Sequence, residues 1–156
     1  MKTKDRVMGV KSYQTVTKAR LVKEPTEILR FAVTTSKQAY EFAADLYDDD
    51  IEVLESFYCI YLNRANKIIS YSHISHGGVA GTLVDPKIIF KIAIDLLCSG
   101  IILVHNHPSG NHTASEADKS LTREIQQVAR FHKISILDHL IISPHGYFSF
   151  ADMGLL

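Results

Sequence analysis

Two patterns of apolar and polar positions recur along the chain. Short apolar or alternating runs predict strands, and apolar residues spaced three or four apart predict helices. Residues 101–104, Ile-Ile-Leu-Val, form a short apolar run directly after Gly100, which is typical of a buried strand. After Ser115, apolar residues instead recur every three or four positions through Ala129, which is typical of an amphipathic helix. We therefore expect a strand that leads into a helix across residues 105–114.

Two further helices are predicted upstream of this strand. The first has Ser36 as its N-cap and runs through Tyr47. The second starts at Asp85, whose side chain can cap a helix that opens with Pro86, and it ends at Gly100. Because this second helix is apolar on nearly all sides, we expect it to be buried in the centre of the domain.

Strand patterns occupy much of the remaining chain. Segments 55–62 and 67–73 are separated by turn-forming residues 63–66, which predicts a β-hairpin. Segment 134–142 predicts one or two strands, and residues 147–150 predict a last short strand. The sequence thus predicts a mixed α/β fold in which a central sheet has helices packed against it.

Length and composition are those of a globular domain without a strong overall charge. The 156 residues are most simply one domain, long enough to bury on the order of 70% of the unfolded surface. The 17 basic and 17 acidic residues cancel, so no global field favours nucleic acid or a membrane. No apolar run approaches the roughly 20 residues of a membrane span, and no signal-peptide core follows the N-terminus. We expect a cytoplasmic protein.

Two charged segments and two cysteines each allow more than one interpretation. Residues 1–24 carry seven basic and two acidic residues, which fits either a nucleic-acid-binding arm or a solvated terminus. The aspartates at 48–50 could bind a hard cation, but a solvated loop at a helix end is more common. Cys59, on a predicted strand, and Cys98, on a predicted helix, lack metal or redox spacing and are expected to be buried thiols.

The richest chemistry lies between the buried strand and the amphipathic helix. His105 and His107 are two residues apart at the strand end, so both side chains can project to one side. A Pro-Ser-Gly turn at 108–110 follows, and Ser115 and Asp118 lie where the helix begins. Two histidines and one carboxylate make a three-ligand zinc site whose fourth position is left to water.

Each part of this motif also has a purely structural interpretation. Ser115 and Asp118 could form only a capping box at the helix N-terminus. A pair of histidines on a strand is likewise ambiguous when taken alone. The combination of both with a turn of fixed length favours a bound divalent metal.

The spacing of His105, His107, Ser115 and Asp118 resembles the JAMM, or MPN-plus, metalloprotease motif. The sequence HNHPSG at 105–110 resembles the bacterial RadC branch of that family. Further pieces agree with RadC proteins: GGVAGT at 77–82, VDP at 84–86, Asp138-His139 and Ser149-Phe150. The resemblance covers the chain from about Ser36 onward. It implies an N-terminal extension over residues 1–35 and a catalytic domain over residues 36–156. That domain would have the cytidine-deaminase-like JAMM architecture, a central mixed sheet with flanking helices.

The resemblance also implies a site and an activity. One zinc ion per chain would be held by His105, His107 and Asp118. Ser115 would stabilise an oxyanion, and Glu55 would be the general base. The substrate would be a peptide or an isopeptide. Two features depart from the family pattern: Ala114 replaces a common proline, and the helix-hairpin-helix region that often precedes this domain is not visible.

The residues themselves do not establish Glu55 as a base. A glutamate that leads into a strand is more often exposed than catalytic, and sequence alone cannot bring Glu55 to His105. Only the family pattern favours Glu55, with Glu52 as the second choice. Asp138 or His139 could orient a metal ligand, although a polar pair at a strand bulge is equally consistent.

His73 and His76, in a predicted glycine-containing loop that could line the cleft, have no partner at metal-binding spacing and are left out of the site.

Three functions agree with these observations. The first is a zinc-dependent metallopeptidase or isopeptidase, which the complete ligand set favours. The second is a DNA-repair-associated RadC-like protein that acts by DNA or protein binding. The RadC resemblance implies this function, and among sequence features only the basic residues 1–24 support it. The third is a zinc-bearing binding module without turnover, but a structural zinc is expected to have four protein ligands.

Overall fold

A computed structural model of the chain describes residues 32–47, 51–77 and 83–156. Within this part, five strands form one sheet: β1 (Ser56–Leu62), β2 (Ile68–His76), β3 (Gly100–Asn106), β4 (Ser135–Ser143) and β5 (Gly146–Ser149). Three helices accompany it: α1 (Ser36–Ala44), α2 (Pro86–Asp95) and α3 (Glu116–Phe131). The basic segment 1–24, the aspartates 48–50 and most of the GGVAGT segment lie outside the described residues.

The strands lie in the order β2-β1-β3-β4-β5. Only β3 and β4 are parallel, and all other neighbours are antiparallel. The predicted hairpin is β1 and β2, and the segment expected to form one or two strands is the single strand β4. Since parallel neighbours need a crossover connection, α3 carries the chain from the end of β3 back to the start of β4. The predicted mixed α/β fold with flanking helices is confirmed.

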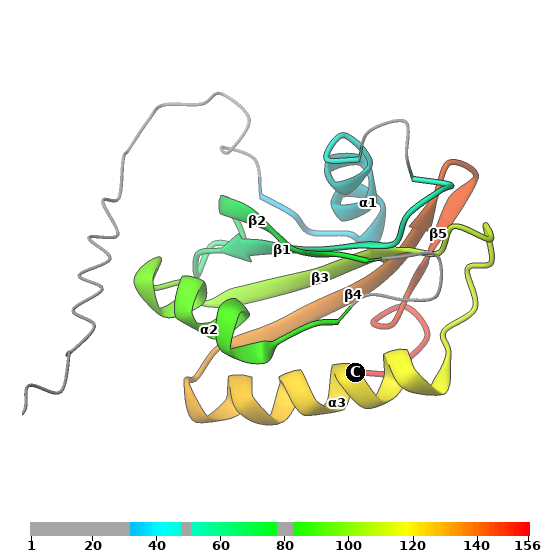
Figure 1. Ribbon diagram of the computed structural model, residues 1–156. Helices are drawn as coiled ribbons and strands as arrows, with labels where there is room; N and C mark the ends of the chain where they lie inside the picture. Colours follow the sequence, from blue (N-terminus) through cyan, green and yellow to red (C-terminus); the bar gives the residue numbers. More distant parts are fainter. Residues whose placement is uncertain (1–31, 48–50, 78–82) are drawn as a thin grey trace, which may run out of the picture.

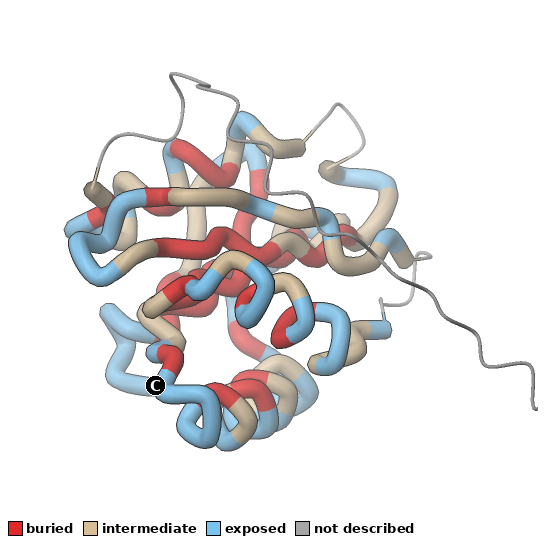
Figure 2. Tube along the Cα trace, turned by 90° about the vertical axis from the view of Figure 1, so that its left-hand side faces the viewer, coloured by how far each residue is buried: buried red, intermediate tan, exposed pale blue. Residues whose placement is uncertain are grey.

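The helices cover both faces of the sheet (Figure 1). One core lies between α1 and the sheet and includes Phe42, Ile60 and Ile102. The other lies between the sheet and α2 and α3 and includes Ile89 and Ile125. Figure 2 shows the buried residues along the strands and the inner sides of the helices, with exposed turns on the outside. The sheet is therefore the middle layer of three.

Strand alternation decides which side chains face α3. Along β1 and β3 the core residues at odd positions pack toward α2 and α3, and those at even positions pack toward α1. Phe57 of β1 pairs with His105 of β3, and their rings stack with centroids 5.9 Å apart. Leu103 pairs with His139 of β4, whose ring lies on the same side. Histidines from two strands thus meet under the start of α3.

The N-cap of α1 is Thr35 and not the predicted Ser36. The Thr35 side chain accepts a hydrogen bond from the backbone N–H of Gln38. Ser36 is the first helical residue, and its hydroxyl donates to Asp152 Oδ2 at 2.5 Å. A contact with the distant C-terminal segment therefore occupies the serine. The helix also ends before the predicted Tyr47, at Ala44.

Helix α2 begins as predicted, with Asp85 as N-cap and Pro86 in the first turn, but it is not central. Its inner side is buried against the sheet, whereas Ile88 and Ile94 on its outer side are 45% and 46% exposed. An apolar composition on all sides was expected to mean burial on all sides. Among the described residues, the sheet and α3 contact α2 and leave its outer side exposed, so the prediction of central burial is wrong.

The end of α2 also lies earlier than predicted. The helix ends at Asp95, and Leu97 adopts a positive φ of 51° with its side chain 83% exposed. Cys98 lies in the connection after the helix, where it is buried. Gly100 does not end the helix but begins β3, where a Cβ atom would lie 2.7 Å from the Leu137 side chain. Close strand packing therefore explains this glycine.

The two cysteines and the histidines of β2 lie outside the predicted site. Cys59 on β1 and Cys98 are both buried free thiols, as expected, and burial raises the pKa of Cys98 to about 11. Strand β2 extends beyond the predicted end at His73 to His76, so both histidines lie on the strand. None of the described helices is both long enough and apolar enough to cross a membrane.

Asn106, the last residue of β3, holds the segment that precedes β1. Its side chain is fully buried and accepts from the Ser56 N–H at 2.7 Å. The same amide donates to the carbonyl oxygens of Ile51 and Leu54, at 2.6 and 2.9 Å. Glu55 lies within this clamped segment, so the position of Glu55 depends on Asn106.

We expect Asn106→Ala to lower the free energy of unfolding by about 3 kcal/mol, because three backbone groups lose their buried partner. Urea unfolding of the zinc-free protein measures this change. Asn111→Ala is the matched control, since the exposed Asn111 side chain accepts a single hydrogen bond from Thr113 N–H. A loss below about 1 kcal/mol, the value of one ordinary hydrogen bond, would contradict the role of the clamp.

Candidate metal centre

Side chains from β3, the loop after it and α3 converge at one end of the sheet. The Nε2 atoms of His105 and His107 lie 2.9 Å apart. Asp118 Oδ1 is 3.2 Å from His105 Nε2, and Asp118 Oδ2 is 3.5 Å from His107 Nε2. Each residue offers one ligand atom to a group that lies within 4.8 Å. The three residues predicted as ligands therefore form a cluster that can hold a metal ion.

Local structure fixes the two histidines. His105 is the sixth residue of β3 and only 2% exposed, so its ring has a fixed orientation between the sheet and α3. His107 directly follows the strand, where its carbonyl accepts from the Gly110 N–H at 2.9 Å. Gly110 has a φ of +74°, which glycine adopts without strain. The predicted turn thus brings the chain away from the sheet immediately after the second histidine.

Asp118 caps the helix and also faces the two histidines, so the two roles that the sequence left as alternatives are compatible. The capping box is present: Asp118 Oδ2 accepts from the Ser115 N–H at 2.7 Å, and Ser115 Oγ accepts from the Asp118 N–H at 3.1 Å. Ser115 Oγ also lies 2.6 Å from Oδ2 and donates to it. The other carboxylate oxygen, Oδ1, faces His105. Helix capping therefore orients the carboxylate for the cluster.

Hydrogen bonds on the outer side of the rings direct lone pairs inward. His107 Nδ1 lies 2.7 Å from the carbonyl oxygen of Asn111, which can only accept, so Nδ1 carries the proton. The neutral His107 ring then presents a bare Nε2 to His105 Nε2 and the Asp118 carboxylate. Such a cluster of lone pairs is repulsive unless a cation lies among them, either a proton or a metal ion.

The donor set fits zinc. Zinc bonds of about 2.0–2.1 Å in tetrahedral geometry place neighbouring ligand atoms about 3.3 Å apart. The measured separations of 2.9, 3.2 and 3.5 Å lie around this value. Imidazole nitrogens and a carboxylate oxygen are ligands that zinc accepts. We therefore propose zinc as the metal.

The cluster shifts the pKa values of its members. Burial alone would raise the pKa of Asp118, but the contacts with His105 and then His107 outweigh burial and hold this pKa well below its usual range. The hydrogen bond with Asp118 raises the pKa of His107 above its ordinary value, against the effect of burial. A proton and a metal ion therefore compete for the same atoms of this cluster.

Glu55 lies beside the cluster. It directly precedes β1, and the Phe57–His105 pairing continued by two residues places Glu55 opposite His107. Glu55, His105 and His107 line the same pocket of about 380 Å³. Apolar side chains, including Val84, form part of its wall. The antiparallel pairing of β1 with β3 thus brings together residues about fifty positions apart.

The second-choice base, Glu52, is exposed and does not line this pocket. Ser115 does line it, and the Ser115 hydroxyl is directed at Asp118. The structure therefore brings Glu55 and Ser115 to the metal cluster, and their chemical roles stay predictions.

Of the two residues predicted to orient a ligand, His139 contacts the cluster. His105 Nδ1 lies 2.8 Å from His139 Nε2. Asp138 instead accepts from the backbone N–H of Ala151 at 3.0 Å and from the Ser149 hydroxyl at 2.7 Å, which anchors the C-terminal segment. Burial holds the pKa of His139 well below its ordinary value.

Thr122 also belongs to this network and was missed in the sequence. Its hydroxyl contacts His139 Nδ1 at 2.7 Å and donates to the Asp118 carbonyl at 2.6 Å. Its spacing of one helical turn from Asp118, on the buried side of α3, is a signal that could have identified it.

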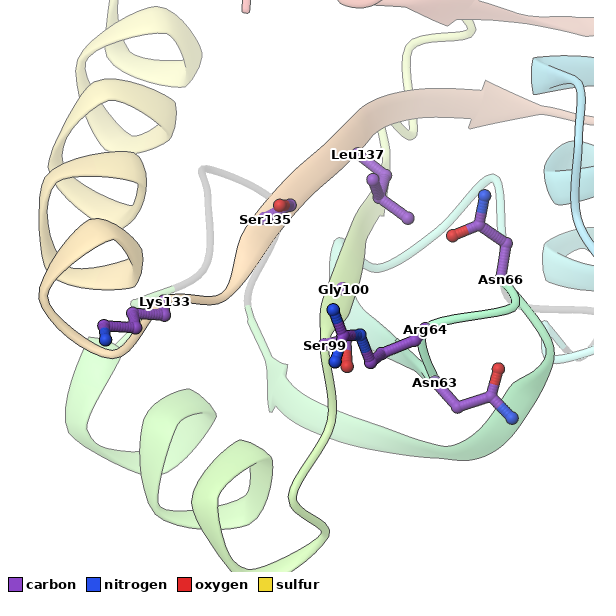
Figure 3. Close-up of a pocket in the computed structure, with 8 residues that line it drawn as sticks. All are labelled: Asn63, Arg64, Asn66, Ser99, Gly100, Lys133, Ser135 and Leu137. Atoms are coloured by element: carbon purple, nitrogen blue, oxygen red, sulfur yellow. The ribbon is translucent and has the colours of Figure 1, made fainter.

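Another hollow of about 500 Å³ lies where the β1–β2 turn meets the beginnings of β3 and β4 (Figure 3). Its lining is mostly polar and contains no carboxylate. In Figure 3 the Arg64 side chain extends toward Ser99 and Gly100, whereas the ammonium of Lys133 points away from Arg64. Because the two cations do not converge, this hollow does not form a charge-based site, and it contains none of the predicted site residues.

Comparison with known proteins agrees with the fold and the cluster. The family model of the RadC-like JAB domain matches residues 33–155. The chain therefore belongs to the RadC-like JAB domain family.

Relatives at the sequence level are UPF0758 proteins. One from Flavobacterium johnsoniae is 40% identical over 123 residues, which cover 79% of this chain and 53% of the relative. One from Porphyromonas gingivalis is 43% identical over 132 residues, which cover 81% and 56%. The protein YfjY of Escherichia coli K12 is 38% identical over 102 residues, which cover 65% and 64%. This chain thus spans about half the length of the first two relatives.

We expect zinc affinity to fall as the pH decreases, because protons compete for the same Nε2 atoms. The raised pKa of His107 means that this loss begins above the ordinary histidine pKa of about 6.5 and approaches tenfold per pH unit and proton. Chelator competition from about pH 8 to pH 5 measures it, with the exposed His132→Gln as a control of unchanged profile. Constant affinity down to about pH 6 would contradict proton competition at this site.

Proposed function

We propose that this protein is a zinc-dependent metallohydrolase that cleaves amide bonds in a peptide or isopeptide substrate. The observation that carries the proposal is the convergence of His105, His107 and Asp118 beside Glu55 in one pocket. A three-residue ligand set leaves a coordination position for water, as in catalytic zinc sites. Membership of the JAB family, whose JAMM motif this sequence resembles, supports the same activity.

Zinc, when bound by His105, His107 and Asp118, supplies a Lewis acid and lowers the pKa of a coordinated water to about 7. Glu55 lines the same pocket and would act as the general base, taking a proton from the attacking water and returning it to the leaving amine. The Asn106 clamp fixes the backbone on both sides of Glu55. A general base must keep its position between the two proton transfers, so this clamp suits the role.

Ser115 is the donor proposed for a developing oxyanion. Its hydroxyl lines the pocket and donates to Asp118 Oδ2 at 2.6 Å. Rotation about the Cβ–Oγ bond can redirect this proton to a substrate oxygen, since the capping box keeps the backbone in place. One such donor contributes about 2.7–4 kcal/mol to catalysis in enzymes of known mechanism.

The other functions considered from the sequence have less support. The basic residues 1–24 lie outside the described part of the chain, so DNA binding stays a sequence-based prediction. A zinc-bearing module without turnover would not require a glutamate in the pocket beside a three-residue ligand set. The cytoplasmic location expected from the sequence likewise stays a prediction.

We expect about one zinc ion per chain in the wild type and in Glu55→Gln, and a loss of zinc in Asp118→Ala. Glu55→Gln should reduce turnover of peptide and isopeptide substrates by about a hundredfold or more, since it removes the base and keeps the ligands. Metal analysis and chelator-sensitive cleavage assays measure the two effects.

Glu52→Gln is the matched control, because it makes the same change three residues earlier at an exposed position and should leave turnover unchanged. Full activity of Glu55→Gln would show that the base is wrongly assigned. A wild type that takes up no zinc after reconstitution would exclude the proposed metallohydrolase.

A further inference from the structure

A continuous path of hydrogen bonds runs behind the metal cluster. The Thr122 hydroxyl donates to the backbone carbonyl of Asp118 at 2.6 Å and lies 2.7 Å from His139 Nδ1. His139 Nε2 lies 2.8 Å from His105 Nδ1. The path thus begins at the carbonyl of one ligand residue and ends at the ring of another, through residues of α3, β4 and β3. We call Thr122 and His139 the relay.

The chemistry of its ends gives the relay one direction. A carbonyl oxygen can only accept, so the single hydroxyl proton of Thr122 is used for Asp118. The Thr122 oxygen must then accept from His139 Nδ1–H. A neutral His139 ring with its proton on Nδ1 has a bare Nε2, which accepts from His105 Nδ1–H. His105 Nε2 is therefore left as the atom that faces Asp118 and His107.

The surroundings of His139 favour the neutral ring. It is 0% exposed and lies between the rings of Phe57 and Phe150, with centroid distances of 5.7 and 4.8 Å. Its side-chain hydrogen bonds within the described residues are those with Thr122 and His105, and neither partner is a carboxylate. No carboxylate among the described residues contacts the ring, and burial of an unpaired charge is costly.

We propose that Thr122 and His139 are positioning residues that set the tautomer of His105 for metal binding before the metal arrives. The inference rests on the proposed zinc site and extends it beyond the three ligands. A metal ligand whose other ring nitrogen is held by a hydrogen bond loses no orientational freedom on binding. Since the relay starts on α3 and ends on β3, it also couples the orientation of His105 to the position of the Asp118 backbone.

Two pairs of variants separate this role from simple packing. Glutamine can place its side-chain oxygen near the position of His139 Nε2, whereas asparagine reaches only the position of Nδ1. We expect His139→Asn to lower zinc affinity by about ten- to a hundredfold and His139→Gln to stay within about threefold of the wild type. Thr122→Val should lower zinc affinity by about tenfold, and Thr122→Ser, which keeps the hydroxyl, should not.

Chelator competition gives the zinc affinities, and melting temperatures of the zinc-free variants show whether they fold equally well. The ring ¹⁵N shifts of the zinc-free wild type, recorded at a pH where the imidazoles are neutral, should report Nδ1–H tautomers for His105 and His139. Packing alone would not select one tautomer of His105. If His139→Asn fails to fold, the Thr122 pair decides between the two roles.

Wild-type zinc affinity in a folded His139→Asn, or an Nε2–H tautomer of His105 in the wild type, would overturn the inference. These results differ from a failure of the proposed function. If the wild type binds no zinc, the metallohydrolase proposal fails, and the ring shifts still show whether the relay fixes the tautomer. If the wild type binds zinc and the variants bind it equally well, only the positioning role fails.

Discussion

The contact between the first turn of α3 and the end of β3 is the constraint on which the site depends. A parallel β3–β4 pair requires a crossover, and this crossover must pack on the sheet face to which His105 points. Ile125 and Ala129 bury the inner side of α3 there. The helix N-terminus, with Asp118 in its capping box, is thereby held against the two histidines. Core packing and ligand convergence are consequences of one crossover.

Polar residues in the middle of this sheet are arranged so that each has a partner. His105 and Asn106 are neighbours on β3, and strand alternation directs them to opposite sides. His105 reaches the metal cluster and His139, while Asn106 holds the segment that contains Glu55. Because an unpaired buried polar group is costly, these partners restrict the geometry more strongly than apolar packing would. The candidate ligand His105 and the proposed base Glu55 are thus both held from the same end of β3.

The two interpretations of Ser115 and Asp118 turned out to be compatible for a physical reason. A carboxylate has two oxygens, and the capping box uses mainly one of them, at 2.7 Å from the Ser115 N–H. The other oxygen is directed to His105. Capping therefore does not compete with ligation in this fold. It reduces the freedom of the carboxylate, which favours a metal site in the same way as the positioning role proposed for Thr122 and His139.

The sequence by itself determined what depends on neighbouring residues. Strand β3, the turn after it, the capping box and the candidate ligands are all specified within residues 100–118, where backbone geometry leaves few alternatives. Membership of the JAMM-like family was also evident from this stretch. Helix α2 began where Asp85 and Pro86 predicted. Local hydrogen bonding and periodicity are sufficient for such features, because they act over a few residues.

Tertiary structure decided what depends on distant contacts. The β1–β3 pairing brought Glu55 to the cluster, and the β3–β4 pairing selected His139 rather than Asp138 as the partner of His105. Ser36 contacts the distant Asp152 and is the first residue of α1, and Thr35 is the N-cap of this helix. The outer side of α2 is exposed, and the sequence of a helix does not determine how many other elements pack against it. Pairing between strands that are tens of residues apart depends on the whole fold, so a local sequence pattern does not predict it.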